Sequence, residues 1–256
     1  MKITILGSGA SGGVPLIGPV WGHCDPQNQK NRRRRSSILI EDGKTRVLVD
    51  ASPDCRMQLL DADVNYLDGI IFTHAHADHC HGIDDLRWIN QSMSKALPAF
   101  SDAASFEEIN KRFGYAFAPF EVPDHGYFNR PVLQWQEAKD EFSIGNISFR
   151  CFKQDHGFSN TLGLRFGNVG YSTDVVRLDE MAFEILDGIE VFIVGCLRED
   201  PHPTHVDLPT ALSWIERINP KRAIISHMNH MMDYDQVRTK VPAGVEPAYD
   251  GLILSV

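Results

Sequence analysis

Four side chains that can bind a metal lie within six residues in the segment Thr73-His74-Ala75-His76-Ala77-Asp78-His79. The segment directly follows the apolar stretch 69–72, which reads as a short strand. Imidazoles and carboxylates are typical ligands of zinc, manganese or iron, and crowding them together is unfavourable unless a cation lies among them. A surface run of histidines is the alternative, but such a run is expected in a polar tract rather than after an apolar strand. The segment therefore predicts a transition-metal site at a strand end.

Three further candidate ligands repeat one rule, in which an apolar strand ends in a histidine or an aspartate. His156 follows a strand that ends near residue 152, Asp174 follows the strand 169–172, and His227 follows the strand 222–226. A lone histidine after a strand is more often a satisfied polar group than a ligand, so each position alone is a weak signal. Their repetition predicts that they complete the same site.

The composition is typical of a folded α/β protein. The chain has 256 residues, of which 43% are hydrophobic and 23% charged, and this suits a single domain over residues 1–256. The formal net charge of −9 argues against binding of nucleic acid by bulk attraction. Residues 1–6 read as a strand rather than a signal peptide, and no apolar run approaches the ~18 residues that span a bilayer. Five widely spaced cysteines suit reduced thiols, so we expect a cytoplasmic protein.

The pattern of apolar residues predicts two sheets with helices outside them. Strands are predicted at residues 2–6, 37–40, 45–49, 69–73, 144–152, 161–166, 169–172, 191–194 and 222–226, with a hairpin turn at Asp42-Gly43. Apolar residues at three- and four-residue spacing predict helices at 84–93, 106–113, 179–186 and 208–218, the last with Asp207 as its N-cap. Residues 115–131 are rich in aromatics and prolines. They read either as an irregular loop over the site or as a loop whose aromatics close the edge of the core.

The order of the candidate ligands resembles that of the metallo-β-lactamase superfamily: HxHxDH, a single histidine, an aspartate after a strand, and a final histidine. The resemblance extends from Lys2 to about Leu254 and implies an α/β fold, a four-layer αββα sandwich of two mixed sheets with the site at one edge. By that resemblance, one metal would be bound by His74, His76 and His156 and the other by Asp78, His79 and His227, with Asp174 bridging and Asp50 bracing the metal segment. Two metals ~3.5–4 Å apart can share a hydroxide and stabilise both oxygens of an in-line displacement.

A histidine outside the ligand set points to one branch of that superfamily. His205 precedes the predicted helix at 208, and it resembles the general-acid histidine of the phosphodiesterase branch, which includes the carbon-phosphorus lyase accessory (PhnP-like) enzymes. The alternative is a histidine that only caps the helix entry. The segments Gly7-Ser8-Gly9-Ala10-Ser11-Gly12-Gly13 and Tyr249-Asp250-Gly251 also resemble this branch. The resemblance implies a binuclear phosphodiesterase for small or cyclic nucleotide-like phosphodiesters, with two divalent ions (zinc or manganese, or iron) and with His205 and Asp78 as catalytic residues.

The sequence departs from that branch around Cys24. The lyase-associated enzyme has several cysteines here that form a separate structural zinc site, whereas this chain keeps only Cys24 and, beside it, His23. His230, three residues after His227, matches the remaining ligand of that site. A further zinc at Cys24, His23 and His230 is one option, and loss of the site is the favoured one.

Four consecutive arginines occupy positions 32–35. The usual interpretation is a solvated charge run. Because alternate residues of a strand face opposite sides, one or two of them are also placed to contact a phosphate, with Arg34 and Arg35 as the candidates.

Two other functions share much of this pattern. Thioester or lactone hydrolysis, as in glyoxalase-II-like proteins, uses the same ligands, and only His205 and the N-terminal resemblance argue against it. A non-catalytic carrier or accessory protein of the quinone-cofactor biosynthesis type is the third interpretation, against which the complete ligand set argues. As partners, the sequence predicts a small phosphodiester or nucleotide-like substrate, no membrane and no bulk nucleic-acid binding, and it allows a homodimer.

Overall fold

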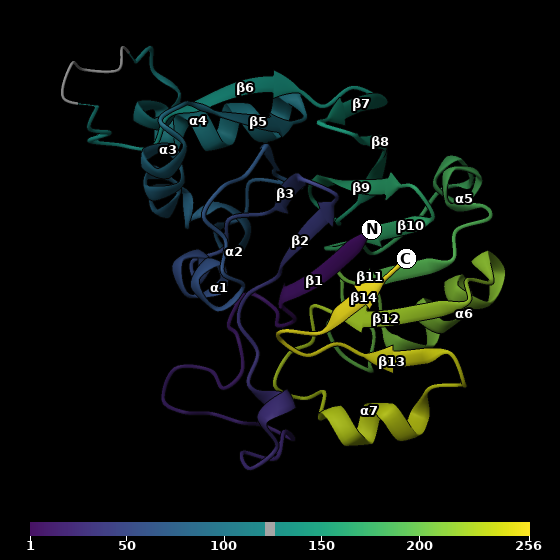
Figure 1. Ribbon diagram of the computed structural model, residues 1–256. Helices are drawn as coiled ribbons and strands as arrows, with labels where there is room; N and C mark the ends of the chain where they lie inside the picture. Colours follow the sequence, from purple (N-terminus) through teal and green to yellow (C-terminus); the bar gives the residue numbers. More distant parts are fainter. Residues whose placement is uncertain (121–125) are drawn as a thin grey trace.

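The computed structural model describes residues 1–120 and 126–256 (Figure 1). Its strands are β1 (Lys2–Gly7), β2 (Ser37–Asp42), β3 (Thr45–Val49), β4 (Gly69–Ile71), β5 (Leu97–Ser101), β6 (Leu133–Glu137), β7 (Glu141–Ile144), β8 (Ile147–Asp155), β9 (Asn160–Phe166), β10 (Val169–Ser172), β11 (Val191–Gly195), β12 (Arg222–Ser226), β13 (Val245–Pro247) and β14 (Ile253–Ser255). Its helices are α1 (Cys55–Asp61), α2 (Ala77–Cys80), α3 (Arg87–Met93), α4 (Ala103–Phe117), α5 (Glu180–Leu186), α6 (Leu208–Ile218) and α7 (Tyr234–Lys240), with short 3-10 turns η1 (Gln29–Asn31) and η2 (Ile83–Leu86).

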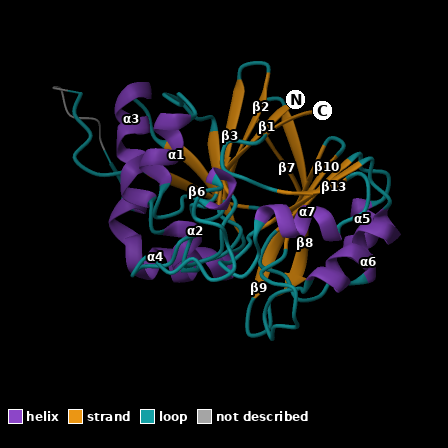
Figure 2. Ribbon diagram, turned by 90° about the horizontal axis from the view of Figure 1, so that it is seen from below, coloured by secondary structure: helices purple, strands orange, loops and turns teal. Residues whose placement is uncertain are grey.

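The strands form two seven-stranded sheets that pack face to face. The first has the order β14-β1-β2-β3-β4-β5-β6 and the second the order β13-β12-β11-β10-β9-β8-β7. Each sheet is mixed, because β3 to β6 and β10 to β13 pair in parallel while the other strands pair antiparallel. Figure 2 shows the sheets edge-on, with α1, α3 and α4 outside one and α5 and α6 outside the other. Helix α7 lies beside the edge strand β13 (Figure 1). The predicted four-layer αββα sandwich is confirmed.

Both faces of the central strands are buried, which explains their nearly continuous apolar sequences. Along β2, Ile38 and Ile40 point into the core between the sheets, where they join side chains of the second sheet such as Leu164. Leu39 points the other way and packs beneath α1, α3 and α4. On the second sheet, the opposite-facing Phe192 packs against α5 and α6. Three apolar layers therefore hold the four layers of backbone together.

Two predicted elements are corrected by the structure. The expected strand 144–152 is a hairpin of β7 and β8, because Gly145 adopts a positive φ of 57° and turns the chain. The expected helix 84–93 divides into η2 and α3, because Leu86 is both the last residue of the 3-10 turn and the cap of the following helix. The hairpin of β2 and β3 and the Asp207 cap of α6 are confirmed: Asp207 Oδ1 accepts a hydrogen bond of 2.8 Å from Thr210 N.

The described residues of the aromatic segment 115–131 pack at the edge of the core. Its first residues belong to α4, and Phe117, Phe120 and Phe128 line a hollow with Trp135 of β6. None of its described residues lines the pocket beside the candidate metal ligands. Residues 121–125, which also belong to this predicted loop, lie outside the described residues.

All five cysteines are buried and free. Within residues 1–120 and 126–256, no helix combines the length and the apolar character needed to cross a membrane.

Candidate metal centre

The parallel strands of both sheets end at one edge of the sandwich, and the candidate ligands follow those ends. Asp50 follows β3, Asp174 lies two residues after β10, and His227 follows β12; all three adopt the left-handed conformation, with φ values of 65°, 49° and 54°. This conformation is uncommon for residues other than glycine, although Asp and His are enriched in it. The chain turns sharply at each strand end, and the three side chains point into the same space.

A glycine makes room for this convergence. Gly195 ends β11, between β10 and β12, and a Cβ atom there would lie 3.2 Å from Thr173 Cα and 3.3 Å from His227 Cβ. These separations are tighter than ordinary van der Waals contacts, so a larger residue would push the two neighbouring strand ends apart.

Asp50 braces the segment between β4 and α2. Its carboxylate accepts hydrogen bonds from Thr73 N and Thr73 Oγ1, both at 2.8 Å, and lies 2.7 Å from His79 Nδ1. The carboxylate is fully buried. Because one side chain holds both the start of the segment and one of its histidines, the orientation of the His79 ring is fixed by β3.

The seven predicted ligands lie in two clusters that share one carboxylate. The ligand atoms of each cluster lie within 4.8 Å of one another; the first cluster contains His74, His76, His156 and Asp174, and the second contains Asp78, His79, Asp174 and His227. Such an arrangement of imidazoles and carboxylates suits divalent transition metals.

Asp174 is surrounded by imidazoles. Its Oδ1 lies 3.2 Å from His79 Nε2 and 3.3 Å from His227 Nδ1. Its Oδ2 lies 3.2 Å from His205 Nε2 and 3.8 Å from Nε2 of both His74 and His156. One carboxylate oxygen therefore faces each cluster.

Hydrogen bonds orient the rings so that one nitrogen of each faces the centre. His156 Nδ1 lies 2.7 Å from the carbonyl oxygen of Thr204, which can only accept, so Nδ1 carries the proton and Nε2 keeps its lone pair. His79 Nδ1 likewise contacts the Asp50 carboxylate, which directs Nε2 of this ring to the centre. Among the described residues, Nε2 of His74 and Nε2 of His79 are buried and have no hydrogen-bond partner. A buried lone pair without a donor is unfavourable, and a bound cation would satisfy both nitrogens.

The protonation states also favour a cation. Burial lowers the pKa of His227 to about 4 and lowers the pKa of His74 and of His156, so these rings are neutral at neutral pH. Burial would also lower the pKa of His79, but the surrounding carboxylates outweigh it and hold that pKa well above its usual value. Burial would raise the pKa of Asp174, yet the neighbouring histidines hold it well below its usual range. The centre therefore carries negative charge that positive charge must balance.

His205 lies beside both clusters. Its ring stacks on that of His227, with centroids 5.2 Å apart, and its Nδ1 lies 2.8 Å from Thr204 Oγ1. The side chain remains 14% exposed, whereas Asp174 is 3% exposed. Nε2 of His205 lies 3.2 Å from Asp174 Oδ2, and the N-cap of α6 is Asp207 rather than His205.

Among the described residues, the side chains of Cys24, His23 and His230 do not form the further zinc site that the sequence left open. The Cys24 thiol contacts the carbonyl oxygen of Met232 at 3.5 Å and Nη1 of Arg33 at 3.8 Å. His23 is exposed and pairs with His230 through backbone atoms, His23 N donating to His230 O. Within residues 1–120 and 126–256, these three residues do not form a group with metal-ligand spacing. The guanidinium of Arg33 lies at this place instead.

The four arginines face different sides, as expected for a strand entry. Arg34 Nη2 pairs with Asp61 Oδ2 at 2.5 Å, away from the candidate ligands. Arg35 pairs with Asp54 at 3.1 Å through Nε and lines a pocket of about 500 Å³ together with Asp78. Of the two candidates, only Arg35 lines a pocket at the metal centre.

Some polar groups at the centre carried no signal in the sequence. Ser36 Oγ lies 2.9 Å from His227 Nδ1, and Arg112 of α4 donates to the carbonyl of Ala75, between two candidate ligands. Ser36 follows the arginine run directly, but a serine at the start of a strand does not indicate a contact with a histidine 191 residues away. Arg112 lies on a helix more than thirty residues downstream of the segment that it contacts, so only the fold reveals it.

Comparison with known proteins assigns the family. Residues 45–228, more than half of the chain, match the model of the beta-lactamase superfamily domain. The chain belongs to that superfamily. The resemblance drawn from the ligand order is confirmed.

Three relatives narrow the comparison within the beta-lactamase superfamily. The chain is similar to a solved structure described as a new diphosphatase from the PhnP family, with a TM-score of 0.90 and 28% identity over 100% of this chain and 97% of the other. It is 27% identical to coenzyme PQQ synthesis protein B of Xanthomonas campestris over the full length of both. It is 30% identical, over 98% of its own length, to an octanoyltransferase of Porphyromonas gingivalis, but it spans only 51% of that protein. Together with the ligand clusters, these similarities support a metal-dependent hydrolase.

Proposed function

We propose that the chain is a phosphodiesterase with two divalent metal ions that acts on small, nucleotide-like phosphodiesters. The observation that carries the proposal is the shared Asp174: two four-residue clusters meet at this carboxylate, and His205 Nε2 lies 3.2 Å from it. Divalent ions held there would generate a water-derived nucleophile at neutral pH and offset charge on the reacting phosphate. His205 would protonate the departing oxygen, as a positioned imidazole does in general acid catalysis.

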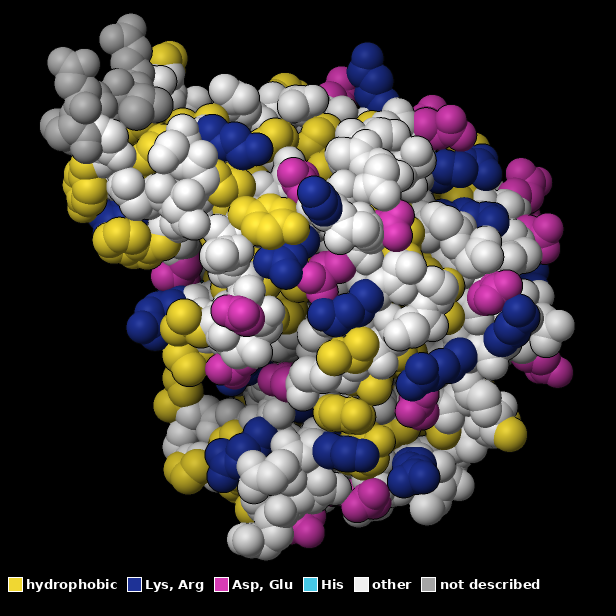
Figure 3. All heavy atoms as spheres, viewed as in Figure 1, with side chains coloured by type: hydrophobic (Ala, Val, Ile, Leu, Met, Phe, Trp, Pro, Cys, Tyr) yellow, Lys and Arg dark blue, Asp and Glu magenta, His cyan; other side chains and the backbone are white. Residues whose placement is uncertain are grey.

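The pockets on either side of the clusters suit a substrate with two halves. One pocket, of about 740 Å³, is lined by His74 and His76 of the first cluster. The other, of about 500 Å³, is lined by Asp78 of the second cluster. Both volumes lie in the range of small-molecule sites. The net charge of −9 gives no bulk attraction for a polynucleotide, which favours a small substrate, and on the face shown in Figure 3 basic and acidic side chains are interspersed.

The similarity to the PhnP-family diphosphatase supports cleavage of a phosphorus–oxygen bond, because the match covers 97% of that structure at a sequence identity of 28%. A diphosphate linkage joins two phosphates through one bridging oxygen, and it presents the same in-line geometry as a phosphodiester. Substrates with one and with two phosphates therefore both belong in the test.

The proposal is tested on protein purified without chelator. We expect about two transition metals per chain, and hydrolysis of bis(p-nitrophenyl) phosphate and of 2′,3′-cyclic nucleotides that chelation abolishes and added zinc or manganese restores. Metal content is measured by elemental analysis and turnover by release of p-nitrophenol or nucleotide. Metal-loaded protein that hydrolyses none of these esters nor a dinucleoside diphosphate would contradict the proposal.

A matched pair of arginines tests the phosphate contact. Arg35→Ala is expected to lower kcat/KM for bis(p-nitrophenyl) phosphate by about tenfold or more, because a charged hydrogen bond to phosphate contributes roughly 1.5–3 kcal/mol. Arg34→Ala removes the same charge from the preceding residue. The Arg34 side chain pairs with Asp61 outside this pocket, so the substitution should leave kcat/KM within about twofold. Equal effects of the two substitutions would show that Arg35 acts only through net charge.

An accessory role in quinone-cofactor biosynthesis is the second candidate, favoured by the full-length similarity to coenzyme PQQ synthesis protein B. In that case, we expect the metal-loaded protein to bind a ligand without converting it to a product. Thioester hydrolysis is distinguished by activity on S-lactoylglutathione or an octanoyl thioester without activity on phosphate esters. The octanoyl probe is chosen because one relative is an octanoyltransferase.

A further inference from the structure

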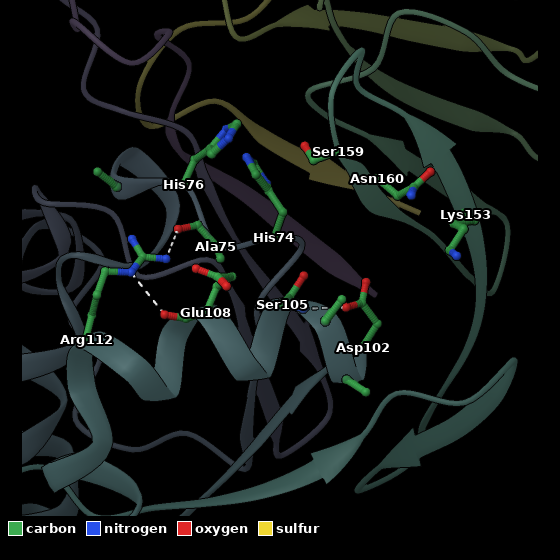
Figure 4. A pocket seen from close by; sticks show the side chains of 13 residues that line it. His74, Ala75, His76, Asp102, Ser105, Glu108, Arg112, Lys153, Ser159 and Asn160 are labelled. Atoms are coloured by element: carbon green, nitrogen blue, oxygen red, sulfur yellow. Dashed lines mark hydrogen bonds between the residues drawn. The ribbon is translucent and has the colours of Figure 1, made fainter.

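The pocket beside His74 and His76 has two walls with different chemistry (Figure 4). The end of β8, the turn after it and the start of β9 form one wall, with Lys153, Ser159 and Asn160. Helix α4 and the residue before it form the other, with Asp102, Ser105, Glu108 and Arg112. The two candidate metal ligands join the walls, so a molecule held at the metals extends between them.

The charges on the α4 wall are already engaged. Asp102 caps the helix, accepting a hydrogen bond of 2.6 Å from Ser105 N, and Glu108 pairs with Lys111 at 2.7 Å. Arg112 donates to the carbonyl oxygens of Ala75 and Glu108. The two carboxylates of this wall and the guanidinium of Arg112 therefore already have partners within the protein.

The polar side chains of the opposite wall have no such partners among the described residues. In the described chain, the Lys153 amine makes no ion pair or hydrogen bond, and the side chains of Ser159 and Asn160 have no hydrogen-bond partner there. Lys153 is held in place by its backbone, which pairs with Leu162 in the antiparallel ladder of β8 and β9. The same strand leads directly into His156, so the backbone of Lys153 is held close to the first cluster, while its exposed, flexible side chain is free to turn toward a bound group.

We propose that Lys153, with Ser159 and Asn160 beside it, binds a second, non-reacting phosphate group of the substrate. The inference rests on the proposed phosphodiesterase function and extends it to the substrate class: a diphosphate such as a nucleoside diphosphate ester. An ammonium group is a strong point-charge donor to phosphate, and neighbouring hydroxyl and amide donors complete the coordination of its oxygens. In a chain with a net charge of −9, an anionic substrate needs such local positive charge.

A pair of nucleotides that differ by one phosphate tests this subsite. We measure binding of ADP and of AMP to the metal-loaded protein by isothermal titration calorimetry, in wild type and in Lys153→Gln. ADP is expected to bind wild type more tightly than AMP. The substitution is expected to weaken ADP binding about tenfold and to change AMP binding by less than about twofold, because only ADP carries the second phosphate.

Lys44→Gln is the matched control. Lys44 is an exposed lysine in the turn directly before β3, at the opposite end of that strand from Asp50, and its substitution should leave both affinities unchanged. Equal weakening of ADP and AMP in Lys153→Gln, or no weakening of either, would overturn the subsite. Selective ADP binding by wild type without hydrolysis of any phosphate ester would contradict the proposed function and leave the subsite standing, so the two failures are distinguishable.

Discussion

Asp174→Asn is expected to lose most of the bound metal and to lower turnover of phosphodiesters on the order of 10³-fold, because even groups outside the ligand shell change metal affinity about 10- to 100-fold. Asparagine keeps the size of the side chain and tolerates the positive φ of 49° at this position. It removes the negative charge and replaces one acceptor oxygen by an NH₂ donor. In the wild type, one carboxylate oxygen faces each cluster, Oδ1 at 3.2 Å from His79 Nε2 and Oδ2 at 3.8 Å from His74 Nε2. An amide has only one acceptor oxygen and cannot offer an oxygen to both clusters.

Elemental analysis and hydrolysis of bis(p-nitrophenyl) phosphate measure the two effects in one preparation. Asp207→Asn serves as the control, since it is the same chemical change two residues after His205 and asparagine caps a helix as well as aspartate does. Asp174→Asn protein that retains about two metals and the turnover of wild type would exclude a bridging role for this carboxylate.

The clustering of the candidate ligands could be predicted because their positions follow a local rule. Each ligand group sits directly after an apolar strand, and burial on both faces makes those strands visible in the sequence as continuous apolar stretches. The sequence also predicted that Asp174 and His227 lie in the same site, and both follow strands that pair in parallel with β11. Parallel strands place their carboxyl ends at the same edge, as β10 and β12 do on either side of β11.

The pocket beyond the ligands could not be predicted, because its walls depend on how distant elements pack. Arg112 reaches Ala75 only because α4 lies across the first sheet, and nothing in the sequence around residue 112 indicates a contact with the metal segment. Lys153 reads as an ordinary exposed position of a strand. The same limit applies to Cys24, where a histidine and a cysteine suggested a zinc site and the fold brings the buried Arg33 against the thiol instead.

His205→Ala is expected to keep its metals and to lower kcat about 10²- to 10⁴-fold on a 2′,3′-cyclic nucleotide, the usual contribution of a general acid. On bis(p-nitrophenyl) phosphate the loss should be much smaller. The difference comes from the leaving group: p-nitrophenolate is a stable anion that departs without a proton, whereas a ribose alkoxide must be protonated as it leaves. The imidazole is suited to that transfer because its Nε2 lies 3.2 Å from the shared carboxylate and its side chain is partly exposed.

His202→Ala is the control for this comparison. The His202 ring lies 5.2 Å from the ring of His205 and contacts Thr204 rather than Asp174, so its loss should lower kcat by less than about tenfold on either substrate. Equal deficits of His205→Ala on the two substrates would contradict proton donation and indicate that the ring instead stabilises charge on the phosphate. Because metal content is measured in the same preparations, a deficit caused by a lost ion is separated from a deficit caused by a missing proton.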